Sequence, residues 1–144
     1  MKSEILVIDD NVDIRFLICN ILKEKDYIVR SAANFTQAEF EIKKKLPDLA
    51  IIDIKLDKGD RDGIELLKLI MKINKSIPTI MISGHANVQL AVEAIHLGAY
   101  EFLEKPFSTE KILNYVHRAL ESSFLKNEKD KLENKLFHSF DLIG

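Results

Sequence analysis

Two short apolar runs that each end in acidic residues constrain the fold of this chain more than any other feature of its sequence. Residues 5–8 lead directly into Asp9 and Asp10, and residues 49–52 lead into Asp53. Neither run alternates apolar with polar residues, which is typical of strands buried on both faces of a parallel sheet. Open α/β folds place their sites at the carboxyl edge of such strands, so the three aspartates are expected there.

Predicted strands and helices alternate through the first 121 residues. Five strand–helix units with short links predict a parallel sheet that carries helices on both faces. Val12, Phe16 and Leu17 recur with helical spacing in the first helix, and Phe40 is expected on the apolar side of the second. The strands are expected at residues 5–8, 27–29, 49–52, 79–82 and 100–103, and the helices at residues 11–22, 34–46, 64–73 and 88–97 and from residue 108 onward.

Length, charge and cysteine content narrow the class of protein. The chain has 144 residues and a formal net charge of −2, which fits one domain and does not indicate nucleic-acid or membrane binding. No apolar run approaches the roughly 20 residues of a transmembrane helix, and no signal peptide is expected. Cys19 is the single cysteine, which excludes an internal disulfide, and its helical context favours a buried apolar role. A cytoplasmic location is therefore expected.

The composition changes after residue 121, where charged residues dominate and Leu125, Leu132 and Leu136 are sparse apolar positions. No Gly or Pro interrupts residues 121–135, so a helical extension is expected. One interpretation is a solvated linker. The other is a short coiled coil that pairs two copies, because Leu125 and Leu132 are one heptad apart.

Side chains suited to a phosphoryl group follow four of the predicted strands. Asp9 and Asp10 follow the first strand, Asp53 the third, Ser83 the fourth and Lys105 the fifth. Because these strands end at one edge of the sheet, the side chains should converge there. Carboxylates are hard oxygen ligands suited to Mg²⁺, whereas a lysine and a hydroxyl can donate hydrogen bonds to phosphoryl oxygens. The sequence therefore predicts a site for a phosphoryl group beside a magnesium ion.

In this combination and order, the motifs make the chain resemble the receiver domain of two-component response regulators. The resemblance spans about residues 4–121 and implies a flavodoxin-like, doubly wound five-stranded parallel sheet of order 2-1-3-4-5 with five helices. The last helix would extend into a linker. The matching motifs are Asp9-Asp10, Asp53, Ser83-Gly84 and Lys105-Pro106-Phe107.

The resemblance also implies how the acidic residues act. Asp53 would be the nucleophile that takes a phosphoryl group from the phosphohistidine of a sensor histidine kinase. Asp10 and Asp53 would bind Mg²⁺ directly, together with the backbone carbonyl of Lys55. Asp9 would hold a metal-bound water.

Three further residues receive roles from the same resemblance. Lys105 would pair with the phosphoryl group, and the Lys105-Pro106 peptide bond is expected to be cis. Ser83 would hydrogen-bond a phosphoryl oxygen, and Phe102 would turn inward as the switch aromatic. Two alternatives stay open. Ser83 could simply cap the next helix. Phe102 could be an ordinary core residue of an edge strand, and Tyr100 could share the role of switch aromatic.

The loop after Asp53 departs from the common receiver pattern. Asp57 stands where receivers commonly have a proline, and the loop over residues 57–63 is longer and more polar. With residues 83–86 and 98–102, this loop resembles the NtrX branch of NtrC-type regulators. In that branch an AAA+ ATPase that acts on the nitrogen-type alternative sigma factor follows the receiver.

A division into two parts follows from this resemblance. Residues 1–121 would be the receiver and residues 122–144 a helical or coiled-coil linker. Residues 141–144 resemble the start of the ATPase, so the chain is expected to be a fragment cut before that domain. No P-loop and no helix-turn-helix motif is present, so neither ATP hydrolysis nor direct nucleic-acid binding is expected.

The predicted function is that of a phosphoacceptor domain in nitrogen and transcription regulation. Phosphorylation would change a two-state surface formed by residues 88–97, residues 100–103 and the final helix, and would thereby favour a homodimer. The chain would promote only its own phosphorylation and dephosphorylation.

Two other classes of protein remain as alternatives. A magnesium-dependent phosphatase with an aspartyl nucleophile usually carries a second acid two residues later, where this chain has Lys55. A phosphorylation-independent interaction module would not need the complete acidic set together with Lys105. A dinucleotide-binding domain is disfavoured because no Gly-x-Gly-x-x-Gly follows the first strand.

Overall fold

A computed structural model describes residues 2–59, 61–84 and 88–143, with side chains described as far as residue 126. Five parallel strands form one sheet in the order β2-β1-β3-β4-β5, which confirms the predicted strand order. The strands are β1 (Glu4–Ile8), β2 (Ile28–Ala32), β3 (Leu49–Asp53), β4 (Thr79–Ser83) and β5 (Glu101–Glu104). The helices are α1 (Val12–Glu24), α2 (Phe35–Lys44), α3 (Asp62–Ile73), α4 (Val88–His96) and α5 (Thr109–Ile143).

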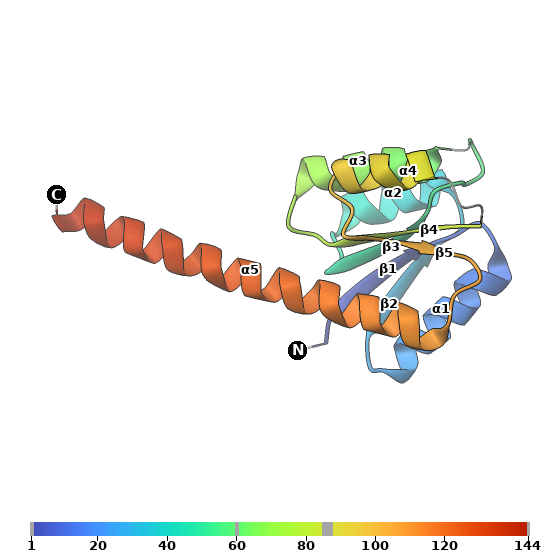
Figure 1. The fold of residues 1–144 in the computed structure, drawn as a ribbon, viewed down its shortest axis with the longest axis horizontal. Helices are drawn as coiled ribbons and strands as arrows, with labels where there is room; N and C mark the ends of the chain where they lie inside the picture. The colour runs from blue at the N-terminus through green and yellow to red at the C-terminus, as the bar shows by residue number, and fades with distance from the viewer. Residues whose placement is uncertain (1, 60, 85–87, 144) are drawn as a thin grey trace.

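Helices cover both faces of the sheet (Figure 1). Successive strand residues point to opposite faces, so each central strand supplies side chains to two separate cores. Leu6 and Ile8 of β1 pack in the core under α2, α3 and α4. Ile5 and Val7 pack in the core under α1 and α5. Burial on both sides explains why β1 and β3 lack polar alternation.

Several helices begin or end at the residues that local sequence signals predicted. Asn11 caps α1, because its side-chain oxygen accepts a hydrogen bond from the Ile14 amide at 3.0 Å. Asn34 caps α2 in the same way through the Gln37 amide at 2.9 Å. Gly98, which follows α4, has a φ of 113°, in the region that favours glycine.

Some predicted boundaries and apolar faces are wrong. β2 extends from Ile28 to Ala32, because it pairs with all five residues of β1. α3 begins at Asp62, two residues before the predicted start. Phe16 is 68% exposed and Phe40 64% exposed.

Phe16 and Phe40 are exposed because a different side of each helix faces the sheet. α1 packs through Ile18 and Leu22, and α2 packs through Ala38 and Ile42. Phe16 and Phe40 each stand two residues from a buried position, and residues two apart lie on different sides of a helix. Val12 and Leu17 of α1 are exposed for the same reason.

The predicted helical extension is confirmed as far as the backbone is described. α5 runs without interruption from Thr109 to Ile143 and continues beyond the sheet (Figure 1). Whether Leu132 and Leu136 make coiled-coil contacts lies outside the described side chains. The predicted motif over residues 83–86 also lies partly outside the described residues, since 85–87 are not described.

Candidate functional site

The predicted site residues lie together at the carboxyl ends of four neighbouring strands. Asp53 is the last residue of β3, and Asp9 directly follows β1, its neighbour in the sheet. Ser83 ends β4 on the other side of β3, and Lys105 directly follows β5. The parallel register places all of these strand ends at one edge, as the sequence predicted.

Three carboxylates form a compact acidic cluster at this edge. One oxygen from each of Asp9, Asp10 and Asp53 lies within 4.8 Å of the others. Asp9 is fully buried and Asp53 is 6% exposed, whereas Asp10 is exposed. Asp9 Oδ1 accepts a hydrogen bond from the Asn11 amide at 2.9 Å. Asp9 Oδ2 is buried and makes no hydrogen bond of suitable geometry, and its close charged neighbour is Lys105 Nζ at 2.9 Å.

The donor set fits a hard divalent cation. Like charges held this close repel each other unless a cation or a proton lies between them. Exposed Asp10 leaves one side of the cluster accessible to solvent, and Mg²⁺ in proteins keeps several waters beside one or two carboxylates.

Lys105 joins the two buried carboxylates. Its Nζ atom donates a hydrogen bond to Asp53 Oδ2 at 3.0 Å and forms an ion pair with Asp9 Oδ2 at 2.9 Å. Burial alone would lower the pKa of Lys105, but its contacts with Asp9 and Asp53 outweigh burial and raise the pKa. Lys105 is therefore a fixed positive charge beside Asp53. The Lys105-Pro106 peptide bond is cis, as expected.

The environment of Asp53 makes its carboxylate costly to ionise when no cation is bound. Burial raises the pKa of Asp53 to about 6; the hydrogen bond from Lys105 opposes this rise and the charge of Asp9 adds to it. The Lys55 amide also donates a hydrogen bond to Asp53 Oδ1 at 3.2 Å. A group that neutralises the cluster would therefore favour the charged form of Asp53.

Ser83 ends β4, and Phe102 lies in the neighbouring edge strand β5. Ser83 is half-buried, and its carbonyl oxygen accepts a hydrogen bond from the Lys105 amide at 2.8 Å. Phe102 pairs in register with Met81 and packs partly against the core under α4. Phe102 also lines a cavity of about 350 Å³ beside α4.

Sequence reasoning missed the structural roles of the loop after Asp53. Asp57 Oδ1 accepts a hydrogen bond from the Phe35 amide at 2.9 Å and so satisfies a free donor at the start of α2. Asp62 is only 9% exposed, and its Oδ2 accepts hydrogen bonds from the Lys58 and Gly59 amides at 2.7 and 3.0 Å. An Asp a few residues after a glycine-bearing turn was the available signal for the second role.

Gly63 contacts the backbone of β3, the strand that ends in Asp53. Its amide donates to the Ile54 carbonyl at 2.7 Å, and a Cβ added at residue 63 would lie 2.3 Å from the Asp53 carbonyl oxygen. Only glycine permits this approach of α3 to β3.

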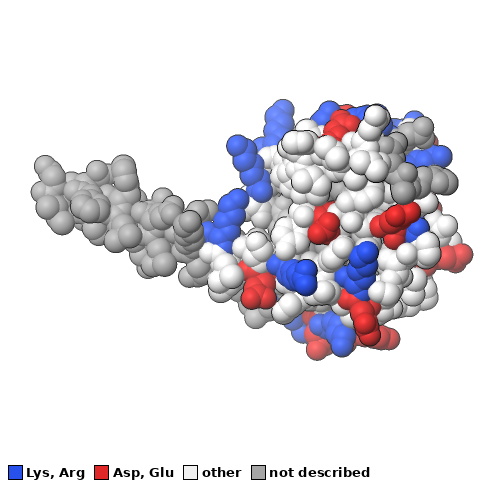
Figure 2. All heavy atoms as spheres, viewed as in Figure 1, with Lys and Arg blue, Asp and Glu red and all other residues white. Residues whose placement is uncertain are grey.

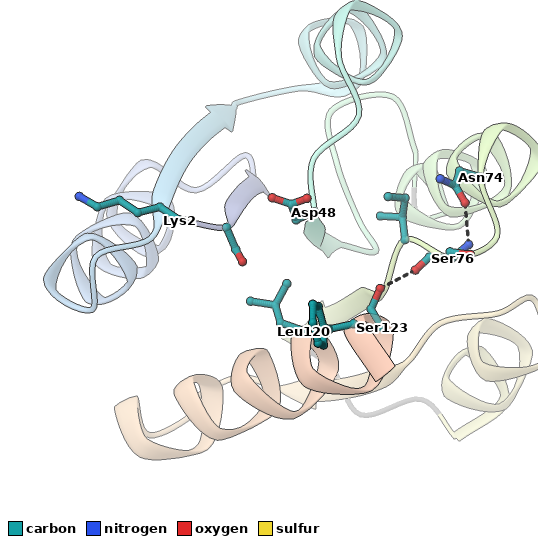
Figure 3. A pocket seen from close by; sticks show the side chains of 9 residues that line it. Lys2, Asp48, Asn74, Ser76, Leu120 and Ser123 are labelled. Atoms are coloured by element: carbon teal, nitrogen blue, oxygen red, sulfur yellow. Dashed lines mark hydrogen bonds between the residues drawn. The ribbon is translucent and has the colours of Figure 1, made fainter. Parts of the chain in front are cut away.

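A larger cavity lies at the opposite edge of the sheet. It has a volume of about 600 Å³ and is lined by residues near the amino ends of strands, among them Ser3, Asp48 and Ser76 (Figure 3). Ser123 of α5 donates a hydrogen bond to the Ser76 carbonyl at its rim, at 3.1 Å. This cavity contains none of the acidic cluster, so it is separate from the candidate site.

A five-stranded doubly wound sheet with an acidic cluster and a lysine at its carboxyl edge defines a receiver domain. The chain belongs to the response regulator receiver domain family, whose match covers residues 5–117. Within that family it is of the NtrX and NtrC type.

Individual relatives support the narrower assignment. The chain is 40% identical over 144 residues to the nitrogen assimilation regulatory protein NtrX of Azorhizobium caulinodans, of which it covers 32%. The crystal structure of NtrX from Brucella abortus superposes with a TM-score of 0.85 at 42% identity, over 92% of this chain and 30% of that one.

The third comparison is with the structure of an isolated receiver domain. The solution structure of the beryllofluoride-activated NtrC4 receiver domain dimer superposes with a TM-score of 0.77 at 36% identity, over 83% of this chain and 98% of that one. The chain thus spans about a third of the length of its NtrX relatives and nearly all of an isolated receiver. Among the described residues, no helix has the length and hydropathy needed to span a membrane.

Proposed function

We propose that the chain is a phosphoacceptor domain in which Asp53 receives a phosphoryl group from a sensor histidine kinase. The observation that carries this proposal is the contact of Lys105 with both Asp9 and Asp53 beside a third carboxylate, Asp10. Lys105 and a cation bound by the carboxylates would stabilise the negative charge that develops on a transferring phosphoryl group.

The proposed transfer breaks the nitrogen–phosphorus bond of a phosphohistidine and forms an oxygen–phosphorus bond to a carboxylate oxygen of Asp53. The histidine leaves with the electron pair of the broken bond. Lys105 would pair with the phosphoryl oxygens, and the Ser83 hydroxyl would donate a hydrogen bond to one of them.

The chain's own oxygens would hold Mg²⁺ beside the acceptor. Asp10, Asp53 and the backbone carbonyl of Lys55 would be direct ligands, and Asp9 would hold a metal-bound water. When bound, Mg²⁺ would neutralise the carboxylates and the charge on the transferring group.

The surface around α4, β5 and α5 is the proposed output of phosphorylation. Val88, Val92 and Ile95 of α4 are exposed, and Phe102 lines the adjoining cavity. The surface over α4 is mainly uncharged in Figure 2. Self-association through such an apolar face is supported by the relative whose activated receiver is a dimer. We therefore propose that phosphorylation favours a homodimer.

The role that we propose for this chain within a longer protein is based on its relatives and not on the chain alone. Residues 1–121 are proposed as the receiver and residues 122–144 as the linker to a transcription-activating ATPase. Control of nitrogen-related transcription in the cytoplasm is proposed on the same ground, because the relatives include a nitrogen assimilation regulatory protein.

Phosphate transfer can be tested with a small phosphodonor. Wild-type protein, Asp53→Ala and the control Asp13→Ala, an exposed residue of α1, would be incubated with Mg²⁺ and acetyl phosphate. Intact-mass measurement should show the addition of one phosphoryl group to the wild type and to Asp13→Ala only. Equal uptake by the folded Asp53→Ala protein would exclude Asp53 as the acceptor.

A further inference from the structure

The loop that follows β3 is tied to the start of α2 through Asp57. Asp57 Oδ1 accepts a hydrogen bond from the amide of Phe35, the first residue of α2, at 2.9 Å. The helix dipole also favours a carboxylate at this position. Lys58, the next loop residue, lies over the Phe35 ring, with its Nζ atom 4.9 Å from the ring centroid. Two consecutive loop residues therefore contact one residue of α2.

The segment between Asp53 and this contact contains Lys55. The Lys55 amide donates a hydrogen bond to Asp53 Oδ1 at 3.2 Å, so the Lys55 backbone lies against a carboxylate of the acidic cluster. The carbonyl of Lys55 is one of the ligands proposed for Mg²⁺. Contacts that hold a metal ligand in place strengthen metal binding, and a backbone ligand is held by whatever holds its loop.

Buried contacts hold the residues on either side of Lys55. Ile54 and Leu56 are buried, and the Ile54 amide donates a hydrogen bond to the Ile82 carbonyl of β4 at 3.0 Å. Lys55 and Asp57, in contrast, are exposed. The hydrogen bond of Asp57 therefore restrains the exposed side of this segment, two residues after the proposed ligand.

We propose that Asp57 is a positioning residue for the magnesium site. By binding the Phe35 amide it fixes the loop and thereby the Lys55 carbonyl, and it acts through Lys55 because it lies outside the acidic cluster. This inference rests on one part of the proposed function, the magnesium ligands. It also gives a role to the residue that stands where receivers commonly have a proline. A hydrogen bond to α2 restrains the loop where a proline ring would otherwise do so.

Calorimetric titration with Mg²⁺ tests this role in two variants of the same residue. Asp57→Ala should weaken Mg²⁺ binding about two- to tenfold, the range for the loss of one hydrogen bond. Asp57→Asn keeps an oxygen that can accept from the Phe35 amide, so it should recover most of the lost affinity.

Asp48→Ala is the matched control. Asp48 is also exposed, and its Oδ2 accepts a hydrogen bond from a single backbone amide, that of Glu4 at 2.7 Å. This contact lies at the amino edge of the sheet, away from the acidic cluster, so Asp48→Ala should bind Mg²⁺ with wild-type affinity.

Phosphate uptake at a series of Mg²⁺ concentrations provides a second measurement. With acetyl phosphate as the donor, the Mg²⁺ concentration for half-maximal uptake should rise in Asp57→Ala by the same factor as the dissociation constant. The rate at saturating Mg²⁺ should change less, because excess ion compensates for weaker binding.

Three results would each overturn the positioning role. The first is wild-type Mg²⁺ affinity in Asp57→Ala. The second is equal weakening in Asp57→Asn, which would indicate loss of charge rather than of the hydrogen bond. The third is equal weakening in Asp48→Ala, which would indicate a general loss of stability. A wild type that binds Mg²⁺ but takes up no phosphate would overturn the proposed phosphate transfer alone, and a wild type that binds no Mg²⁺ would overturn both.

Discussion

The environment and position of Asp53, the proposed phosphoacceptor, depend on individual residues that the sequence patterns did not indicate. Asp53 gains its chemistry from its neighbours Asp9 and Lys105, which come from other strands. Its backbone position depends on Gly63, whose lack of a side chain allows α3 to begin directly against β3. A glycine ten positions away therefore contributes to the geometry of the candidate site.

Gly63→Ala should displace the backbone of Asp53 and reduce phosphate uptake. The added Cβ would lie 2.3 Å from the Asp53 carbonyl oxygen and 2.6 Å from Ile54 Cα, and backbone atoms cannot move aside cheaply. Overpacking of this kind costs about 1–3 kcal/mol of unfolding free energy. Urea unfolding and acetyl phosphate uptake would measure the two effects.

Gly59→Ala is the matched control in the same loop. A Cβ at residue 59 would meet Asp62 Oδ1 at 3.7 Å, an ordinary contact, so stability and uptake should stay close to wild type. Equal behaviour of the two alanine variants would contradict the proposed packing of α3 on β3.

Elements at the amino edge of the sheet are joined by an arginine. Arg30 of β2 forms ion pairs with Glu4 of β1 and with Glu41 of α2, the latter at 2.8 Å. Its Nη2 also donates to the Lys45 carbonyl at 2.6 Å, at the end of α2. Lys45 Nζ in turn lies 3.2 Å from Glu4. β2, an edge strand, is thereby fastened to both its neighbour strand and its helix.

Glu4 should make stability depend on pH in the acid range. Burial opposes ionisation of Glu4, but Lys45 and Arg30 outweigh burial and lower its pKa below 4.5. A carboxyl group with a lowered folded-state pKa contributes stability that is present above pH 4.5 and is lost as pH falls through the folded value.

Glu4→Gln should therefore be less stable than wild type at pH 7 and should converge with it below pH 4.5. Urea unfolding at several pH values would measure the difference. Glu24→Gln, at an exposed position of α1, should change the free energy of unfolding by less than about 0.5 kcal/mol throughout. A Glu4→Gln deficit that stayed constant to pH 3 would contradict the ion-pair contribution.

At the scale of the whole molecule, the receiver body and the extended helix are built differently. Both cores are completed by residues up to Ala119, and Ser123 makes the hydrogen bond to Ser76 near the point where α5 leaves the sheet. Phe124 and Leu125 are already exposed at that point. Among the side chains that the structure describes, none beyond Leu120 packs in either core.

Shortening the chain to residues 1–126 should separate phosphate uptake from coiled-coil pairing. Uptake at Asp53 should be unchanged, because every proposed site residue lies within the body. Sedimentation should show weaker self-association, since Leu132 and Leu136 would be missing. Leu132→Lys in the full chain should give the same weakening. Unchanged self-association in both proteins would favour the solvated-linker interpretation of the tail.

Much of the fold and the composition of the acidic cluster could be predicted because their signals are local. Uninterrupted apolar runs indicated buried parallel strands, and alternation with helices indicated the doubly wound sheet. Once strands are parallel, residues that follow them must meet at one edge, which is why Asp9, Asp53 and Lys105 could be placed together.

The sequence by itself thus determined which strands form and which chemical groups stand at their ends, because hydrophobic periodicity and chain direction are properties of consecutive residues. Only the tertiary structure decided that Phe16 and Phe40 face outward and that Asp57 accepts a hydrogen bond from the first amide of α2. It alone paired Arg61 with Glu93. These outcomes depend on the relative positions of elements that are distant in sequence, and no local pattern encodes such positions.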